Sequence, residues 1–217
     1  MIQRLLLILS LSFFTLISQA DVLPTEVKLN FVGPYQVPAS MTFIHGNGQY
    51  QLDTIVNVPF KNMRFTSKGT MSNNRLITQS FIDTRGGKPY ASATFDTQKK
   101  VITYGRNKQD HTAPMTALAQ DFFTTAWQST LNKAPLAEKL QTTNGKKVYE
   151  RPPFKSAGTI DGYVNGQKTT INLYISGEGD DRVELGLAPN HYYLPALIAY
   201  YEKGKRYELT LRSYTTN

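Results

Sequence analysis

Residues 49–58 read QYQLDTIVNV, and this stretch sets the pattern for most of the chain. Its apolar side chains fall at alternate positions, with polar side chains between them. The apolar set is Tyr50, Leu52, Val56 and Val58, and the polar set is Gln51, Asp53 and Asn57. Successive side chains of a β-strand point to opposite faces, so this spacing predicts a strand with one buried and one solvated face.

The same alternation recurs on both sides of this stretch. Further apolar sets are Val27, Leu29 and Phe31; Met63, Phe65 and Met71; and Ile171, Leu173 and Ile175. Turn signals separate the segments at residues 46–48, 72–74, 85–87, 96–98, 165–166 and 177–180. Half-buried strands joined by tight turns predict an antiparallel meander that curls into a barrel, half-barrel or sandwich. The expected fold class is mainly β: a curved antiparallel sheet, half-barrel or barrel-like, with one amphipathic helix packed on it.

One segment departs from this period and predicts the helix. Over residues 114–131 the apolar residues recur at steps of three and four, and Thr112 is placed to cap the first turn. They are Met115, Leu118, Ala119, Phe122, Phe123, Ala126, Trp127 and Leu131. We expect the helix to dock on the concave side of the sheet through Leu118, Phe122 and Trp127.

The first twenty residues carry the pattern of a secretory signal peptide. Arg4 precedes an uncharged apolar run, residues 5–17, and Ser18-Gln19-Ala20 offers a small-residue cleavage site. A membrane anchor is the alternative, but a helix needs about 20 apolar residues to cross the hydrocarbon layer, and this run is shorter. We expect export, cleavage after Ala20, and a mature chain, residues 21–217, that folds as one β-rich periplasmic domain without a transmembrane segment.

Composition limits the chemistry and the partners of that domain. The full chain has a net charge of +8, and loss of Arg4 with the signal peptide would leave +7. Because export removes most nucleic acid from reach, the partners that the basic excess leaves are anionic lipid head groups, glycans or acidic envelope proteins, and no nucleic acid. The other interpretation of this charge is a basic, soluble surface without a ligand. The chain has no cysteine, which excludes thiol nucleophiles, thiolate metal sites and disulfides.

No motif in the sequence predicts a catalytic residue, a metal or a cofactor. The three histidines, His45, His111 and His191, have no second ligand at a metal-binding spacing. Asp110 precedes His111, but neighbouring side chains usually point apart, so we interpret the pair as polar loop residues. The Gly-x-Ser-x-Gly elbow of serine hydrolases is missing, and residues 177–181, GEGDD, lack the ligand spacing of a calcium loop. A catalytic triad assembled only by the fold stays open as an alternative.

Aromatic side chains give the one positive sign of a binding site. They gather in the predicted helix and near a predicted terminal hairpin, residues 194–201 and 206–213. One interpretation places these rings in the core, and the other places some of them in a concave groove between helix and sheet, where β-barrels often hold ligands. Tyrosine suits the mouth of such a groove because its ring is apolar and its hydroxyl is polar. The residues predicted to bind the ligand are Trp127, Tyr192, Tyr193, Lys203, Lys205 and Arg206.

Several short strings resemble those of a known family. They are Gln120-Asp121-Phe122-Phe123, Leu187-Ala188-Pro189, Tyr193-Leu194-Pro195 and Tyr207-Glu208-Leu209-Thr210-Leu211. In these strings, and in element order over nearly all of residues 21–217, the chain resembles a family of exported bacterial proteins catalogued as domain of unknown function 3108. The resemblance implies a mostly antiparallel β protein of the Gram-negative periplasm. That family has no established activity, so the resemblance implies no catalytic residue.

Together these features predict a non-catalytic periplasmic protein that binds or escorts an amphipathic or anionic component of the cell envelope. Lys203, Lys205 and Arg206 would supply a basic rim. An envelope hydrolase with a site assembled in the fold is one alternative, and a structural or assembly factor that pairs a strand edge with another protein is the other. A deep pocket with convergent titratable groups would favour the enzyme. An apolar groove with a basic rim would favour the carrier, and a flat surface with an open strand edge would favour the assembly factor.

Overall fold

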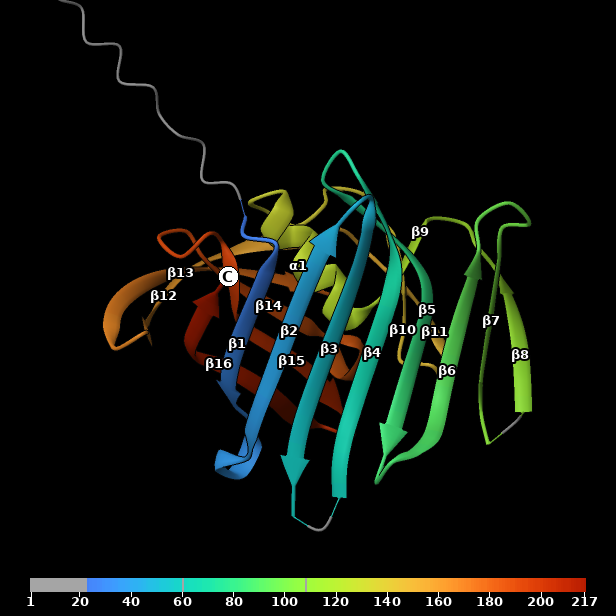
Figure 1. Ribbon diagram of the computed structural model, residues 1–217, viewed down its shortest axis with the longest axis horizontal. Helices are drawn as coiled ribbons and strands as arrows, with labels where there is room; N and C mark the ends of the chain where they lie inside the picture. The colour runs from blue at the N-terminus through green and yellow to red at the C-terminus, as the bar shows by residue number, and fades with distance from the viewer. Residues whose placement is uncertain (1–22, 60, 108) are drawn as a thin grey trace, which may run out of the picture.

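The computed structural model describes residues 23–59, 61–107 and 109–217. The predicted signal peptide, residues 1–20, lies outside these ranges. Within them, the chain forms a 13-stranded antiparallel sheet, a three-stranded sheet and one α-helix, α1 (Phe122–Leu131). The predicted mainly β fold is confirmed: the large sheet curves around the helix and is not closed into a barrel (Figure 1).

Two antiparallel meanders make up the large sheet, and they meet where β1 (Glu26–Val32) pairs with β16 (Lys205–Thr216). The first continues through β2 (Pro38–Gly46), β3 (Gln49–Val58), β4 (Lys61–Ser72), β5 (Arg75–Arg85), β6 (Lys88–Asp96), β7 (Val101–Arg106) and β8 (Gln109–Pro114). The second contains β12 (Lys155–Val164), β13 (Gln167–Ser176), β14 (Val183–Ala188), β15 (Leu194–Glu202) and β16. Strands β8 and β12 are therefore the edges of the sheet. Single 3-10 turns, Pro34–Gln36 and Gly179–Asp181, follow β1 and β13. The predicted terminal hairpin is confirmed as β15 and β16.

The small sheet lies against the concave side of the first meander. It consists of β9 (Leu118–Asp121), β10 (Leu140–Thr143) and β11 (Val148–Arg151). Strands β9 and β10 run parallel, and β10 and β11 run antiparallel. Ala119 of β9 is buried in a satellite core with Phe81 of β5 and Ile102 of β7, so this sheet packs against these strands.

The predicted alternation is confirmed in the first meander and is lost in part of the second. In β1, Val27, Leu29 and Phe31 are buried while Lys28 is exposed. In β14, by contrast, all six residues are buried. Helix α1 packs near this strand, and Ile171 of the neighbouring β13 lies against Gly186.

The helix begins later than the sequence predicted. The prediction of a helix over residues 114–131 is wrong for residues 114–121, because Pro114 ends β8 and Leu118–Asp121 forms β9. The backbone N–H groups of Thr116 and Ala117 donate to the side-chain oxygen of Gln141, at 2.8 and 3.3 Å, instead of entering a helix. Pairing with β10 therefore outweighs the helical spacing of the apolar residues.

The cap of α1 is Asp121, not Thr112, which lies in β8. The Asp121 carboxylate accepts hydrogen bonds from the backbone N–H groups of Phe123 and Thr124, at 3.0 and 3.1 Å, and from the Thr124 hydroxyl. Such bonds satisfy donors that the first helical turn leaves free. Burial raises the pKa of Asp121 above its usual range, although the bonds from Thr124 act in the opposite direction.

Helix α1 is enclosed on its polar side as well as on its apolar side. Every residue from Thr124 to Thr130 is buried. Gln128 accepts a hydrogen bond from the backbone N–H of Leu76 (2.7 Å), and Gln120 donates to the Leu76 carbonyl (2.8 Å). These two side chains pair the backbone at the start of β5, and the Gln128 amide also donates to the Asn74 carbonyl at 2.7 Å. The buried amide of α1 therefore has partners for both its oxygen and its nitrogen.

The predicted docking of Trp127 on the concave side of the sheet is confirmed. Its side chain is fully buried, its ring stacks on Phe43 with centroids 4.3 Å apart, and its indole N–H donates to the Met41 sulfur at 2.9 Å. Phe122 packs partly buried against the same core, whereas Leu118 belongs to β9. Trp127 therefore fixes the helix to β2.

Candidate ligand-binding cleft

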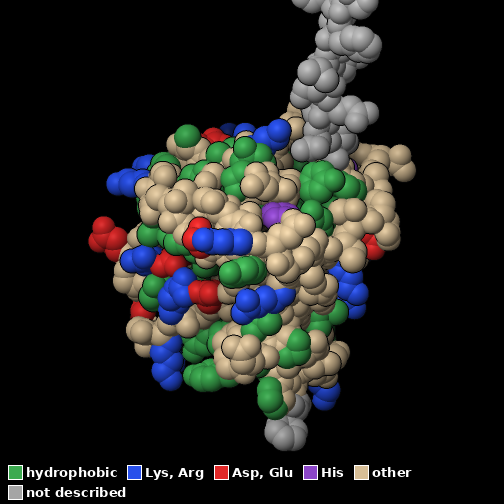
Figure 2. All heavy atoms as spheres, turned by 90° about the vertical axis from the view of Figure 1, so that its left-hand side faces the viewer, with side chains coloured by type: hydrophobic (Ala, Val, Ile, Leu, Met, Phe, Trp, Pro, Cys, Tyr) green, Lys and Arg blue, Asp and Glu red, His purple; other side chains and the backbone are tan. Residues whose placement is uncertain are grey.

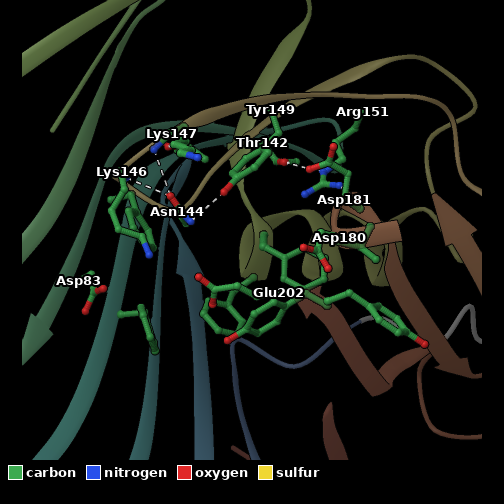
Figure 3. A pocket seen from close by; sticks show the side chains of 18 of the residues that line it. Asp83, Thr142, Asn144, Lys146, Lys147, Tyr149, Arg151, Asp180, Asp181 and Glu202 are labelled. Carbon is green, nitrogen blue, oxygen red and sulfur yellow. Dashed lines mark hydrogen bonds between the residues drawn. The ribbon is translucent and has the colours of Figure 1, made fainter. Parts of the chain in front are cut away.

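A cleft of about 400 Å³ lies beside the N-terminus of α1 (Figure 3). One wall comes from β4 and β5, and the opposite wall comes from β14, the end of β15 and the Gly179–Asp181 turn. Strands β10 and β11 and the loop between them form a third side. The cleft is thus built from segments that are far apart in the sequence and that the curl of the sheet brings together.

The inner surface of the cleft is largely aromatic. Its apolar residues are Met63, Phe65, Phe81, Phe122, Phe123 and Val183. The ring of Phe65 lies 5.2 Å from that of Phe123 and 6.4 Å from that of Phe81, measured between centroids. Phe65, Phe122 and Phe123 are only partly buried, so apolar surface stays open to a ligand. We call the six apolar lining residues together the floor.

Charged side chains of both signs surround the floor. The basic ones are Arg85, Lys146, Lys147, Arg151, Arg182 and Lys203, and the acidic ones are Asp83, Asp180, Asp181 and Glu202. Arg85 is paired with Asp83 at 2.9 Å, and Arg182 with Glu184 at 2.8 Å. Lys146, Lys147 and Lys203 form no ion pair with any residue that the structure describes. We call these three lysines the rim.

The loop between β10 and β11 holds two of the rim lysines in place. The side-chain oxygen of Asn144 accepts hydrogen bonds from the backbone N–H groups of Lys146 (3.0 Å) and Lys147 (3.1 Å), and its amide donates to the Tyr149 hydroxyl (Figure 3). Gly145 has a φ of +78°, and a Cβ there would meet the backbone of residues 91 and 92 at 3.0–3.1 Å. Only glycine fits this turn without strain.

The wall of β14 and β15 contains a hydrogen-bonded network around Glu184, and two of its members, Arg182 and Tyr201, also line the cleft. Its carboxylate accepts hydrogen bonds from the Tyr201 hydroxyl (3.0 Å) and from Arg206 (2.7 and 3.2 Å), and pairs with Arg182. Burial would raise the pKa of Glu184, but the bonds from Arg206 and Tyr201 and the charges of both arginines lower it below its usual range. The network joins β14, β15 and β16 and so stabilises the wall.

The structure brings only one of the predicted ligand-binding residues to the cleft. Lys203 lines it, whereas Trp127 lies in the core and Lys205 is an exposed residue at the start of β16. Arg206 is held by Glu184 and Glu208. Tyr192 and Tyr193 are not in the lining. The basic excess is not gathered on the face shown in Figure 2, where basic and acidic side chains are interspersed.

Tyr192 and Tyr193 form the turn between β14 and β15. Both have left-handed backbone angles, with φ of 52° and 55°, and the N–H of Leu194 donates to the His191 carbonyl at 2.8 Å. This is the geometry of a β-turn with two central residues at positive φ, which asparagine and glycine usually occupy, and it closes the loop formed by residues 189–193. The rings pack against the edge of the main core, and that of Tyr192 meets Tyr214 edge-on.

Tyr200 and Tyr201, at the other end of β15, line the cleft instead. Their aromatic character is visible in the sequence, but nothing local distinguishes them from Tyr192 and Tyr193. The sequence likewise shows the basic residues of the 146–151 segment without showing what they face. The sequence shows how many aromatic and basic residues there are. It does not show which of them the curved sheet brings to the cleft.

The three histidines lie away from the cleft lining. His45 bonds the Pro24 carbonyl, His111 lies 5.7 Å from the Tyr104 ring, and His191 is near Tyr214. Burial lowers the pKa of His191. Within residues 23–59, 61–107 and 109–217, no group of three or more histidine or carboxylate side chains is placed to hold a metal ion.

Comparisons with known proteins return no family model, no curated protein and no solved structure that matches this chain. The resemblance to the exported bacterial family therefore stays a prediction. No helix in the described part of the chain has the length and hydropathy needed to cross a membrane.

Proposed function

We propose that this protein binds an amphipathic, anionic component of the cell envelope in the cleft, with the apolar part on the floor and the charged head near the rim. The observation that carries the proposal is the combination of a partly open aromatic floor with three lysines that have no ion pair in the described structure. An apolar cleft with a basic border is the arrangement that suits a carrier or binding protein.

The floor supplies the affinity in this proposal. Ligand pockets commonly measure about 300–1,000 Å³ and are lined mainly by apolar and aromatic side chains. The cleft, at about 400 Å³, falls within that range. It suits one acyl chain or a similar apolar group, whose burial is favourable by roughly 25 cal/mol for each Å² removed from water.

The rim supplies attraction rather than affinity. The lining has six basic and four acidic residues, so its net charge is positive. Exposed lysines raise the rate at which an anion arrives, and salt screens that effect. The location proposed for this activity is the periplasm, because the predicted signal peptide would export the chain.

The test is binding of N-phenyl-1-naphthylamine, a neutral dye that fluoresces in apolar surroundings, to protein expressed without residues 1–20. We expect saturable binding that dodecanoate displaces. Phe123→Ala should weaken both ligands about tenfold, because it removes part of the floor. The matched control is Tyr192→Ala, which removes a ring of similar size outside the lining and should leave affinity unchanged. No saturable binding, or equal losses in the two variants, would refute the cleft as the site.

A further inference from the structure

Arg151 is a buried charged residue in the wall of the cleft without a carboxylate partner. Its side chain reaches from β11 beside Thr142 and Asp181 (Figure 3), and the residue is only 9% exposed. Its Nε donates to the Thr142 hydroxyl at 3.0 Å, and one terminal nitrogen donates to the Asp181 carbonyl. The other terminal nitrogen, Nη2, makes no hydrogen bond or ion pair with any described residue.

The other two arginines of the lining are different. Arg85 pairs with the buried carboxylate of Asp83, and Arg182 pairs with Glu184. A buried charge without a counter-ion is costly, whereas a buried charge with one is compensated. Burial accordingly lowers the pKa of Arg151, and the charge of Asp181 opposes that shift only in part. Of the three arginines that line the cleft, Arg151 would therefore gain most from the negative charge of a bound ligand.

We propose that Arg151 is the anion-binding residue of the cleft and that it binds the carboxylate or phosphate head of an amphipathic ligand. The proposal rests on the proposed function, because it takes the floor as the site of the apolar chain. A guanidinium suits such heads, since its planar N–H groups match two oxygens and stay charged at every physiological pH.

The surroundings of Arg151 narrow the head group further. Asp180 and Asp181 line the same cleft, and the Asp181 charge acts directly on Arg151. Two nearby carboxylates disfavour a head with several negative charges. The expected head is therefore a monoanion, and a carboxylate is preferred over a phosphate monoester, which carries between one and two charges at neutral pH.

The experiment compares ligands that share the same twelve-carbon alkyl chain and differ in their head group. Dodecanoate and dodecyl phosphate, each below its critical micelle concentration, and dodecanol, below its solubility limit, displace N-phenyl-1-naphthylamine from the wild type and from Arg151→Met. In the wild type we expect dodecanoate to bind best and dodecanol about tenfold or more weakly, as expected for loss of a charge-assisted hydrogen bond. In Arg151→Met the acid should lose that advantage while dodecanol keeps its affinity. The dye, being neutral, should bind both proteins alike.

Two controls separate this proposal from others. Because Arg151 also bonds Thr142 and Asp181, the fluorescence spectrum of the buried Trp127 must match between wild type and variant. Lys146→Gln with Lys147→Gln removes rim charge and should keep the preference for the acid at physiological salt.

If the wild type binds the dye but does not distinguish acid from alcohol, or if the lysine variant alone loses the preference, the role of Arg151 is refuted, while the cleft remains the proposed binding site. If the wild type does not bind the dye, the proposed function fails and this proposal fails with it.

Discussion

The two ends of β15 carry the same dipeptide, Tyr-Tyr, and put it to different uses. Tyr192 and Tyr193 precede the strand and form its turn, with rings against the edge of the core. Tyr200 and Tyr201 come at its far end and line the cleft. At about 3.3 Å per residue, the six residues between the pairs, 194–199, correspond to roughly 20 Å along the strand. The two pairs have the same side chains, so their different roles come from their positions at opposite ends of β15.

The helix repeats the same contrast. At its C-terminal end, the Thr130 hydroxyl donates to the Tyr193 carbonyl at 2.9 Å, and the surrounding residues are buried. At its N-terminal end, Phe122 and Phe123 stay partly open in the cleft. We call these the closed end and the open end. The closed end stabilises the fold, and the open end keeps apolar surface accessible, as a binding site requires.

The largest effect is expected when the side chain of Trp127, which lies between the closed and the open end of α1, is removed. Trp127→Ala should lower the free energy of unfolding by about 3–5 kcal/mol, because it deletes a fully buried indole stacked on Phe43. Urea unfolding followed by far-ultraviolet circular dichroism measures it. Phe123→Ala, which removes a partly exposed ring, should cost less. Equal losses would show that the open end is packed as tightly as the closed end.

The second test concerns the buried carboxylate at the open end. Burial raises the pKa of Asp121, so the folded state favours its neutral form. That contribution to stability is fully present below about pH 4, the usual aspartate pKa, and is lost as pH rises through the folded-state pKa. Asp121→Asn keeps a capping side chain but does not titrate. The stability of the wild type relative to this variant should therefore fall from about pH 4 upward in urea titrations. A rise would mean that the carboxylate is stabilised in its charged form.

A third, smaller effect compares the two tyrosine pairs directly. Tyr200→Ala should weaken binding of the neutral dye several-fold at every salt concentration, since it removes apolar contact area that salt does not screen. Tyr193→Ala should leave the dissociation constant unchanged. Fluorescence titration of both variants decides the point. Weaker binding in Tyr193→Ala alone would return the site to the end of β15 that the sequence first indicated.

The smallest effect is expected at the surface. Lys203 lines the cleft and Lys205 does not, although only Gly204 separates them. Lys203→Gln should slow association of dodecanoate about twofold at low ionic strength, and the effect should disappear at physiological salt, where exposed charges are screened beyond about 8 Å. Lys205→Gln should change the rate less. Stopped-flow displacement of the dye measures both, and identical rates for the two variants would remove the rim from the mechanism.

The alternation along β1 and β3 was sufficient to predict the class of fold. Val27, Leu29 and Leu52 face the core because a strand turns every second side chain to the same side, which is a property of neighbouring residues alone. The turn signals and the terminal hairpin are local in the same sense. The start of α1 was predicted wrongly because the residues that decide it, Gln141 and its neighbours in β10, are distant from it in sequence.

The sequence by itself thus determined a mainly β chain with one helix, an aromatic surplus and a basic charge. Only the tertiary structure decided that Phe65 meets Phe123 and that Lys203, not Lys205, borders the cleft. Likewise, only the folded structure shows that the buried Arg151 has no carboxylate partner. The physical reason is that period and propensity depend on contacts a few residues apart. A cleft depends instead on how far the sheet curls and on which buried polar groups find partners across it.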